Sequence, residues 1–70
     1  MMEFSWENGF EIAVRIEEGQ VVVSANREGL RSLAGQLTTL AESEPGTHIH
    51  LDQYNSLEDG SVELVIERTD

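Results

Sequence analysis

Two histidines and an aspartate recur at alternate positions near the middle of the sequence. The stretch GTHIHLDQ, residues 46–53, contains His48, His50 and Asp52. Successive side chains of a β-strand point to opposite faces, so these three would share one face at steps of roughly 6.5–7 Å. Imidazole nitrogens and carboxylate oxygens can hold zinc at about 2.0–2.2 Å. The pattern therefore permits a metal site, and a solvated or partner-facing strand is the alternative.

The rest of the sequence does not indicate catalysis. A chain of 70 residues buries only about 60% of the surface that its unfolded form exposes, so we do not expect a deep cleft. Cysteine is absent, which excludes disulfides and thiolate zinc sites. The sequence contains no nucleophile elbow, P-loop or dinucleotide fingerprint. Histidines on an open sheet face would also lack the neighbours that orient metal ligands. We therefore expect a non-catalytic protein with no metal and no cofactor.

The charge balance is strongly acidic and indicates the class of partner. Fourteen Asp and Glu residues oppose four Arg, and the formal net charge is −10. Nucleic acids and anionic membranes are bound mainly by positive charge, so we expect neither as a partner. A protein with a basic surface is favoured, although acidity alone also keeps a small domain soluble. The N-terminal residues lack a secretory signal and no apolar run approaches the ~20 residues of a membrane span, so we expect a cytoplasmic protein.

Residues 10–25 have the pattern of a β-hairpin. Apolar side chains alternate with polar or small ones on both sides of Glu18-Gly19, which can form a two-residue turn because Gly allows positive φ. Pairing across this turn brings every apolar pair to one face, with Ile16 opposite Val21, Val14 opposite Val23, and Ile12 opposite Ala25. A one-residue slip would expose the whole apolar set, so the pattern predicts the register.

Asn8-Gly9 predicts a second tight turn, which would add residues 3–7 as a further strand. A strict two-residue turn would set Trp6 opposite Glu11 and direct both Trp6 and Phe4 to the outer face. A β-bulge would instead turn both aromatic side chains into the core. The sequence leaves these two alternatives open.

Residues 26–43 change to helical periodicity. Asn26 is a good N-cap, and the helix should end before Pro45 because the residue preceding proline avoids the helical conformation. The expected inner face consists of the apolar residues at three- and four-residue spacing, namely Leu30, Leu33, Ala34, Leu37, Leu40 and Ala41. The expected outer face carries Arg27, Arg31, Gln36 and Thr38.

Two further strands, within residues 47–53 and 61–68, should complete the domain. Their expected inward side chains are Ile49, Leu51, Val62, Leu64 and Ile66. The sequence thus predicts one α+β domain over residues 1–70. Its expected architecture is a small two-layer (β)ββαββ fold, in which a mostly antiparallel sheet is covered by one helix on one face and is open on the other.

The open face of this sheet is the expected partner-binding surface. It would combine aromatic, arginine and histidine side chains with a rim of carboxylates, a composition typical of protein interfaces. The expected contact residues are Trp6, Glu11, Arg15, His48, His50, Asp52, Tyr54, Glu63 and Glu67. If the strand bound zinc instead, its ligands would be His48, His50 and Asp52. An exposed sheet surface or edge strand also permits a homodimer.

Three stretches within residues 26–67, NREGLRSLAGQLTTLA, GTHIHLD and LEDGSVELVIE, resemble a family of small bacterial proteins known as immunity protein 32 of polymorphic toxin systems. The most specific part is G-x-H-x-H-L-D followed by L-x-x-G-S, which falls on Gly46, His48, His50, Leu51, Asp52, Leu57, Gly60 and Ser61. The resemblance implies a cytoplasmic α+β protein without catalysis that binds and neutralises a cognate toxin. The alternatives are a small metal-binding domain and a homodimeric structural or regulatory module.

Overall fold

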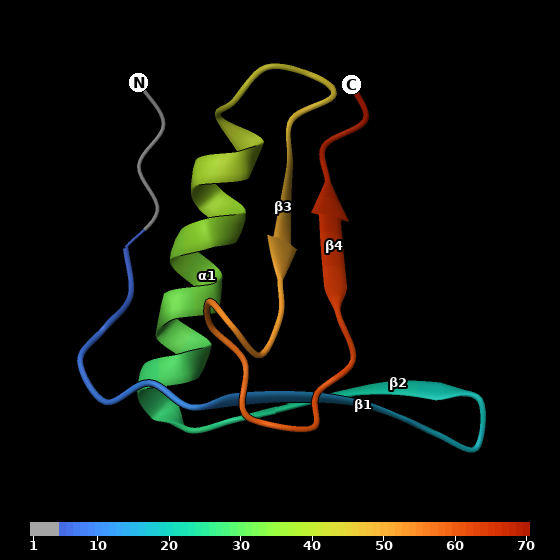
Figure 1. The fold of residues 1–70 in the computed structure, drawn as a ribbon. Coiled ribbons are helices and arrows are strands. Elements are labelled where there is room, and N and C mark those ends of the chain that lie inside the picture. The colour runs from blue at the N-terminus through green and yellow to red at the C-terminus, as the bar shows by residue number, and fades with distance from the viewer. Residues whose placement is uncertain (1–4) are drawn as a thin grey trace.

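The computed structural model describes residues 5–70, which form an α+β arrangement of one helix and two antiparallel two-stranded sheets (Figure 1). The elements in chain order are β1 (Ile12–Glu17), β2 (Gln20–Ala25), α1 (Arg27–Ala41), β3 (His48–Leu51) and β4 (Leu64–Glu67). The β1–β2 hairpin runs across one end of α1, β3 and β4, which stand side by side on it. The predicted α+β class is confirmed, and the strands divide between two sheets instead of forming one.

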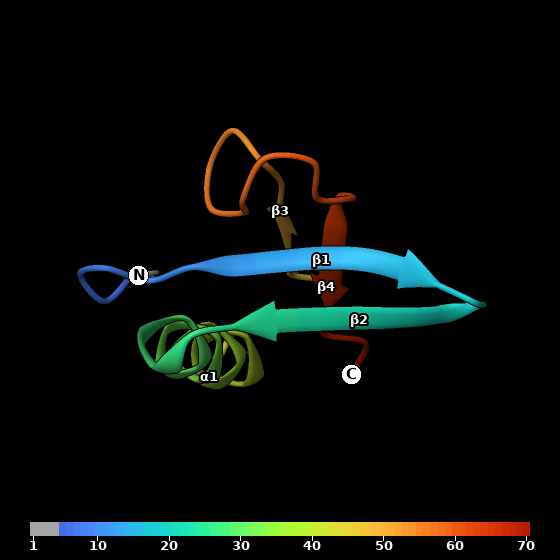
Figure 2. The ribbon, with the colours of Figure 1, turned by 90° about the horizontal axis from the view of Figure 1, so that it is seen from below.

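The predicted register of the β1–β2 hairpin is confirmed. Glu17 pairs with Gln20, and the three apolar pairs follow as expected. Glu18 and Gly19 have φ angles of 50° and 80°, which is the geometry of a type I′ turn. Ile12 and Val14 are buried, whereas Ile16 at the other end of β1 is 63% exposed. The apolar face of the hairpin is therefore covered only at the end near α1, because the turn extends beyond the rest of the molecule (Figure 2).

Main-chain groups on the outer edge of β1 form hydrogen bonds with the loop that precedes β4. The carbonyl oxygen of Ile12 accepts a 2.8 Å hydrogen bond from the Glu58 amide, and that of Val14 accepts one of 3.0 Å from the Val62 amide. The Val14 amide in turn donates to the Ser61 hydroxyl at 3.1 Å. These bonds occupy the edge of β1 where β4 would have joined a single sheet. The chain turns away at this point, so β4 pairs with β3 alone.

The N-terminal segment forms the predicted turn, but residues 5–7, the described part of the predicted strand, are not in a strand. The Phe10 amide donates to the Glu7 carbonyl oxygen at 3.1 Å, and Gly9 has a φ of 84°. The half-buried Trp6 ring stacks on Phe10, with ring centroids 4.9 Å apart, and packs against the core. Of the two open alternatives, the outward position of Trp6 is wrong, since its ring packs inward against the core. The core of so small a chain is thin, and the Trp6 ring adds apolar contacts to it. Residues 3 and 4, including Phe4, lie outside the described residues.

Helix α1 begins at the predicted residue. The Asn26 side-chain oxygen accepts hydrogen bonds from the Gly29 amide at 2.8 Å and from the Glu11 amide at 2.9 Å. Asn26 therefore caps the helix, and it also holds the start of the helix against Glu11, the residue that precedes β1. The helix ends at Ala41, before Pro45, as expected.

The predicted inner face of α1 is confirmed only in part, because Leu40 is buried and Leu33 packs against the core. Leu30 and Leu37 are 56% and 48% exposed, whereas Gln36, expected outside, is 1% exposed. The Gln36 amide donates to the Ser5 carbonyl oxygen at 2.6 Å, and the Glu7 amide donates to the Ser32 hydroxyl at 2.7 Å. Main-chain groups that are partly buried beside the helix need partners, and these two polar side chains supply them. The helix is consequently rotated so that part of its apolar face points to solvent.

Strands β3 and β4 pair antiparallel, with His48 opposite Glu67 and His50 opposite Val65. As predicted, the alternate residues Ile49 and Leu51 face the interior. The buried core consists of Ile12, Val14, Leu51 and Leu57. Val62 lies before β4 and is 39% exposed, so its expected inward position is wrong. Within the described residues, no helix has the length and apolarity needed to cross a membrane.

Candidate partner-binding site

The outer surface of the β3–β4 sheet brings both histidines together with carboxylates. We call this surface the histidine face and define it as His48, His50, Glu63, Val65 and Glu67. The two imidazole rings meet edge to face with centroids 5.0 Å apart. His50 Nδ1 lies 3.1 Å from a Glu63 carboxylate oxygen. The strand alternation that buries Ile49 and Leu51 is what directs both imidazoles outward.

Asp52 does not join the histidines. Its carboxylate accepts hydrogen bonds from the Tyr54 amide at 2.9 Å and the Asn55 amide at 3.1 Å, while its carbonyl oxygen accepts from the Leu57 amide at 2.8 Å. Asp52 thus organises a turn, because β3 ends at Leu51 and the side-chain alternation ends with it. The zinc ligand set of His48, His50 and Asp52 is therefore wrong. Across residues 5–70, no group of three His, Cys, Asp or Glu side chains is arranged to hold a metal ion.

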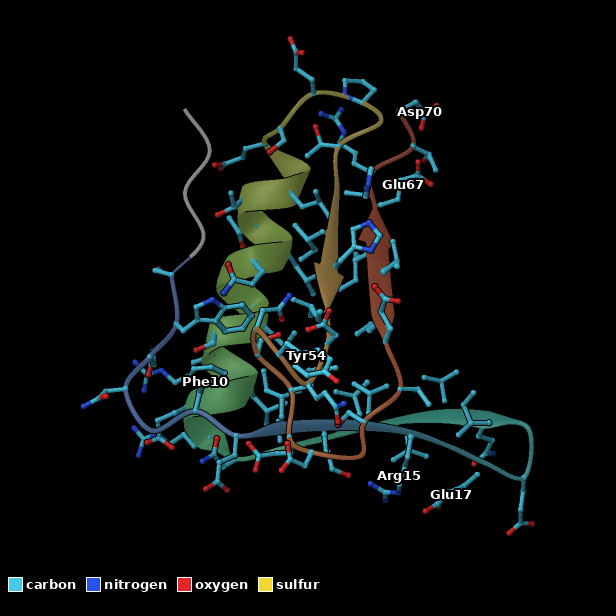
Figure 3. The ribbon with its side chains drawn as sticks, in the orientation of Figure 1. Phe10, Arg15, Glu17, Tyr54, Glu67 and Asp70 are labelled. Atoms are coloured by element: carbon cyan, nitrogen blue, oxygen red, sulfur yellow. The ribbon has the colours of Figure 1, made fainter. Side chains whose placement is uncertain are left out.

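The loop after Asp52 is tied to β3 and presents an aromatic side chain. The Asn55 amide group donates to the His50 carbonyl oxygen at 2.9 Å, and the Gln53 side chain accepts from the Gly60 amide at 3.0 Å. These contacts hold the loop beside the histidine face, and Tyr54 is 88% exposed on it (Figure 3). Exposed tyrosines on a fixed backbone are common anchors of protein interfaces. Sequence reasoning found Tyr54 but missed Asn55, which the Asx-turn pattern D-Q-Y-N could have indicated.

A small cavity lies behind this loop. Its volume is about 260 Å³, and its lining consists of Trp6, Gln36, Ile49, His50, Leu51 and Asn55. The side-chain amides of Gln36 and Asn55 are both engaged by main-chain oxygens. Ligand pockets are typically about 300–1,000 Å³ with several free polar groups that converge on the ligand. The cavity therefore offers little to a substrate, and the outer surface is the better candidate site.

The remaining predicted contact residues lie elsewhere. Arg15 binds the Glu17 carboxylate at 2.5 Å and the Ser24 hydroxyl at 2.8 Å. Figure 3 shows Arg15 and Glu17 on the side of the hairpin that faces away from β3 and β4. Glu11 is four residues before Arg15, so the alternation of an extended chain directs both side chains to the same side. Trp6 packs against the core. The predicted single open face is thus divided into the histidine face, the outer face of the hairpin and an inward-packed tryptophan.

Within the described part of the chain, the arginines make no ion pair with either carboxylate of the histidine face. Arg31 binds the Glu7 carboxylate at 3.1 Å, and Arg68 donates to the Ser43 and Asp70 carbonyl oxygens. Over residues 5–70, Glu67 makes no ion pair, and the ion-pair partner of Glu63 is the His50 imidazole. The negative potential of these carboxylates is therefore available to a partner.

The comparison with protein families covers most of this structure. A family model described as Immunity protein 32 matches residues 20–69, which include β2, α1, the loop of Tyr54 and the whole histidine face. No curated protein matches the chain significantly, and neither does any solved structure. The match extends over far more than half of the chain and includes the motif with both histidines. This protein therefore belongs to the immunity protein 32 family.

Proposed function

We propose that this protein is the immunity protein of a bacterial toxin system and that it neutralises a cognate toxin by binding it. The observation that carries the proposal is the family match over residues 20–69. Membership of an immunity family implies a toxin partner and a generally non-catalytic role. Since the toxin is made by the same cell, the protein acts in the cytoplasm, before the toxin reaches its target.

The proposed contact surface is the histidine face together with Tyr54. It offers a nearly fully exposed aromatic ring as an anchor, together with the carboxylates of Glu67 and of Glu63, which contacts His50. A fixed aromatic centre with a charged rim is the usual composition of a tight interface. Trp6 is proposed to support the core, and Glu11 and Arg15 are proposed to lie outside the interface. Asp52 is a positioning residue that orients the loop.

The toxin that fits this surface has a basic site. An enzyme that acts on nucleic acid must attract phosphates, and the carboxylates of Glu63 and Glu67 can occupy such a groove in their place. The formal net charge of −10 supports the same class of partner. Blocking a basic groove explains neutralisation without any chemistry on the toxin.

The test is growth rescue by co-expression with the cognate toxin. Wild-type protein is expected to restore growth, and the double substitution Tyr54→Ala with Glu67→Lys is expected to abolish rescue. The matched control is Val22→Ala with Glu17→Lys, which changes the hairpin away from the histidine face. Failure of the folded wild-type protein to rescue growth or to bind the toxin would contradict the proposed function.

A further inference from the structure

Helix α1 exposes a regular apolar stripe that the fold does not use. The stripe consists of Leu30, Ala34, Leu37 and Ala41, which follow one another at spacings of four, three and four residues. This spacing aligns side chains along one side of a helix. All four are exposed, while Gly29, Ser32, Gln36 and Leu40 form the buried side. The most apolar side of α1 therefore points away from its own core.

We propose that this α1 stripe binds the same stripe of a second copy, with the two helices antiparallel about a twofold axis. In a twofold antiparallel pair of helices, the numbers of any two residues that face each other add up to the same total. When Ala34 faces Leu37 of the second copy, this total is 71, so Leu30 necessarily faces Ala41. Each contact then joins a large side chain to a small one, which allows the two helices to approach closely.

The charges at the ends of α1 fit the same register. Arg27, at the start of one helix, lies near Glu42, which directly follows the end of the other helix. Over residues 5–70, neither of these two residues makes a side-chain hydrogen bond or ion pair. Arginine at the first helical position and glutamate just after the last one are the reverse of what the helix dipole favours. An antiparallel second helix brings each of these charges beside its opposite, so charge complementarity favours a second copy as the occupant.

The arrangement of the fold leaves room for this contact. Helix α1 forms one outer side of the molecule, beside the hairpin and away from its turn (Figure 2). Arg27 lies at the start of this helix, so one of the four arginines of an otherwise acidic chain is at the contact, whereas Arg31 is held by Glu7. The stripe shares no residue with the histidine face. Dimerisation and toxin binding can therefore be tested separately, and the proposal does not depend on the proposed function.

The first experiment measures the mass of the full chain by sedimentation equilibrium. Two leucines and two alanines per helix make a small interface, so we expect dimers at roughly 0.1 mM and above. Leu37→Lys is expected to weaken dimerisation at least tenfold. The matched control is Val65→Lys, because Val65 is 50% exposed and Leu37 is 48% exposed. Circular dichroism melts of both variants establish that they are folded.

The second experiment tests the register. Arg27→Glu is expected to weaken the dimer, and adding Glu42→Arg in the same chain is expected to restore it. Because the protein has no cysteine, a mixture of Ala34→Cys and Leu37→Cys proteins should form a mixed disulfide faster than either protein does alone. Tyr54→Cys is the control for random collision.

Three results would overturn the proposal. One is a monomeric mass at about 1 mM, the upper end of weak association. Another is a dimer that Leu37→Lys leaves intact, which would assign the contact to another surface. The third is a monomer in which Leu37→Lys abolishes toxin binding, which would assign the stripe to the toxin.

Discussion

The imidazole Nδ1 of His50 lies 3.1 Å from a carboxylate oxygen of Glu63, and this pair links β3 to the segment that leads into β4. Both side chains are more than half exposed. Exposed ion pairs contribute about 0–1 kcal/mol to stability, because water and salt screen them and ordering two side chains costs entropy. The pair therefore has little importance for folding and is free to serve in recognition.

Replacing His50 with alanine is expected to separate binding from folding. The free energy of unfolding, measured by urea denaturation, should change by less than about 1 kcal/mol. Affinity for the toxin, measured by calorimetry, should fall about tenfold or more, as expected for a contact near the centre of an interface. A loss of several kcal/mol in stability with unchanged toxin affinity would make His50 a structural residue.

The two helical glycines are expected to respond in opposite directions to alanine. A Cβ at Gly29 would meet the Glu11 carbonyl oxygen, the Ile12 side chain at 2.9 Å and the Ala25 side chain at 3.1 Å, whereas a Cβ at Gly35 would meet nothing within 4 Å. Gly29→Ala should lower the unfolding free energy by about 1–3 kcal/mol through overpacking. Gly35→Ala should raise it by about 0.5–1 kcal/mol through helix propensity. Urea titrations of both variants measure the difference, and a stabilising Gly29→Ala would contradict the packing of α1 on β1.

A buried glutamine is expected to matter more for stability than the leucine beside it. Gln36→Ala leaves the Ser5 carbonyl oxygen without its 2.6 Å partner, which should cost about 1–3 kcal/mol. Leu37→Ala removes an exposed side chain and should change stability by about 0.5 kcal/mol or less in dilute solution. Thermal melts monitored by circular dichroism compare the two. The reverse order would mean that α1 buries the apolar side that its sequence predicts.

Local signals in the sequence predicted the elements well. The turn at Glu18-Gly19 and the alternation around it specify the β1–β2 register, because only one register puts every apolar pair on one side. Asn26 and Pro45 indicate the limits of α1 for reasons that need no tertiary contacts. The outward position of both histidines likewise follows from strand alternation alone.

The errors arose where tertiary contacts override the local pattern. Periodicity identifies the apolar side of α1 but not whether that side meets its own core or another molecule. Ser32 and Gln36 are buried because the segment of Ser5 runs beside the helix without strand partners. The grouping of Asp52 with the histidines failed because the alternation was extended one residue past the end of β3. The length of β3 is limited by the turn after it, which Asp52 itself stabilises.

Asp52 is expected to act on toxin binding through the loop. Its carboxylate holds the Tyr54 and Asn55 amides, so Asp52→Ala should destabilise the turn by about 0.5–2 kcal/mol, as loss of a comparable cap does. Toxin affinity should fall with it. Asp52→Asn keeps a side-chain oxygen and should retain most of both. The contradicting result is that Asp52→Asn keeps its stability but loses as much toxin affinity as Asp52→Ala. That result would mean that the charge of Asp52 contacts the toxin.

The salt dependence of the association rate with the toxin, measured by stopped-flow fluorescence, tests most directly whether the histidine face is the electrostatic binding surface. Raising salt from low to physiological concentration should slow association about tenfold or more, because screening weakens the steering between opposite charges. The double substitution Glu63→Lys with Glu67→Lys should remove most of this dependence. The matched substitution Glu17→Lys with Glu18→Lys reverses the same number of charges at the hairpin turn and should have a smaller effect. Association that is independent of salt, or a larger effect at the hairpin turn, would contradict toxin binding by the histidine face.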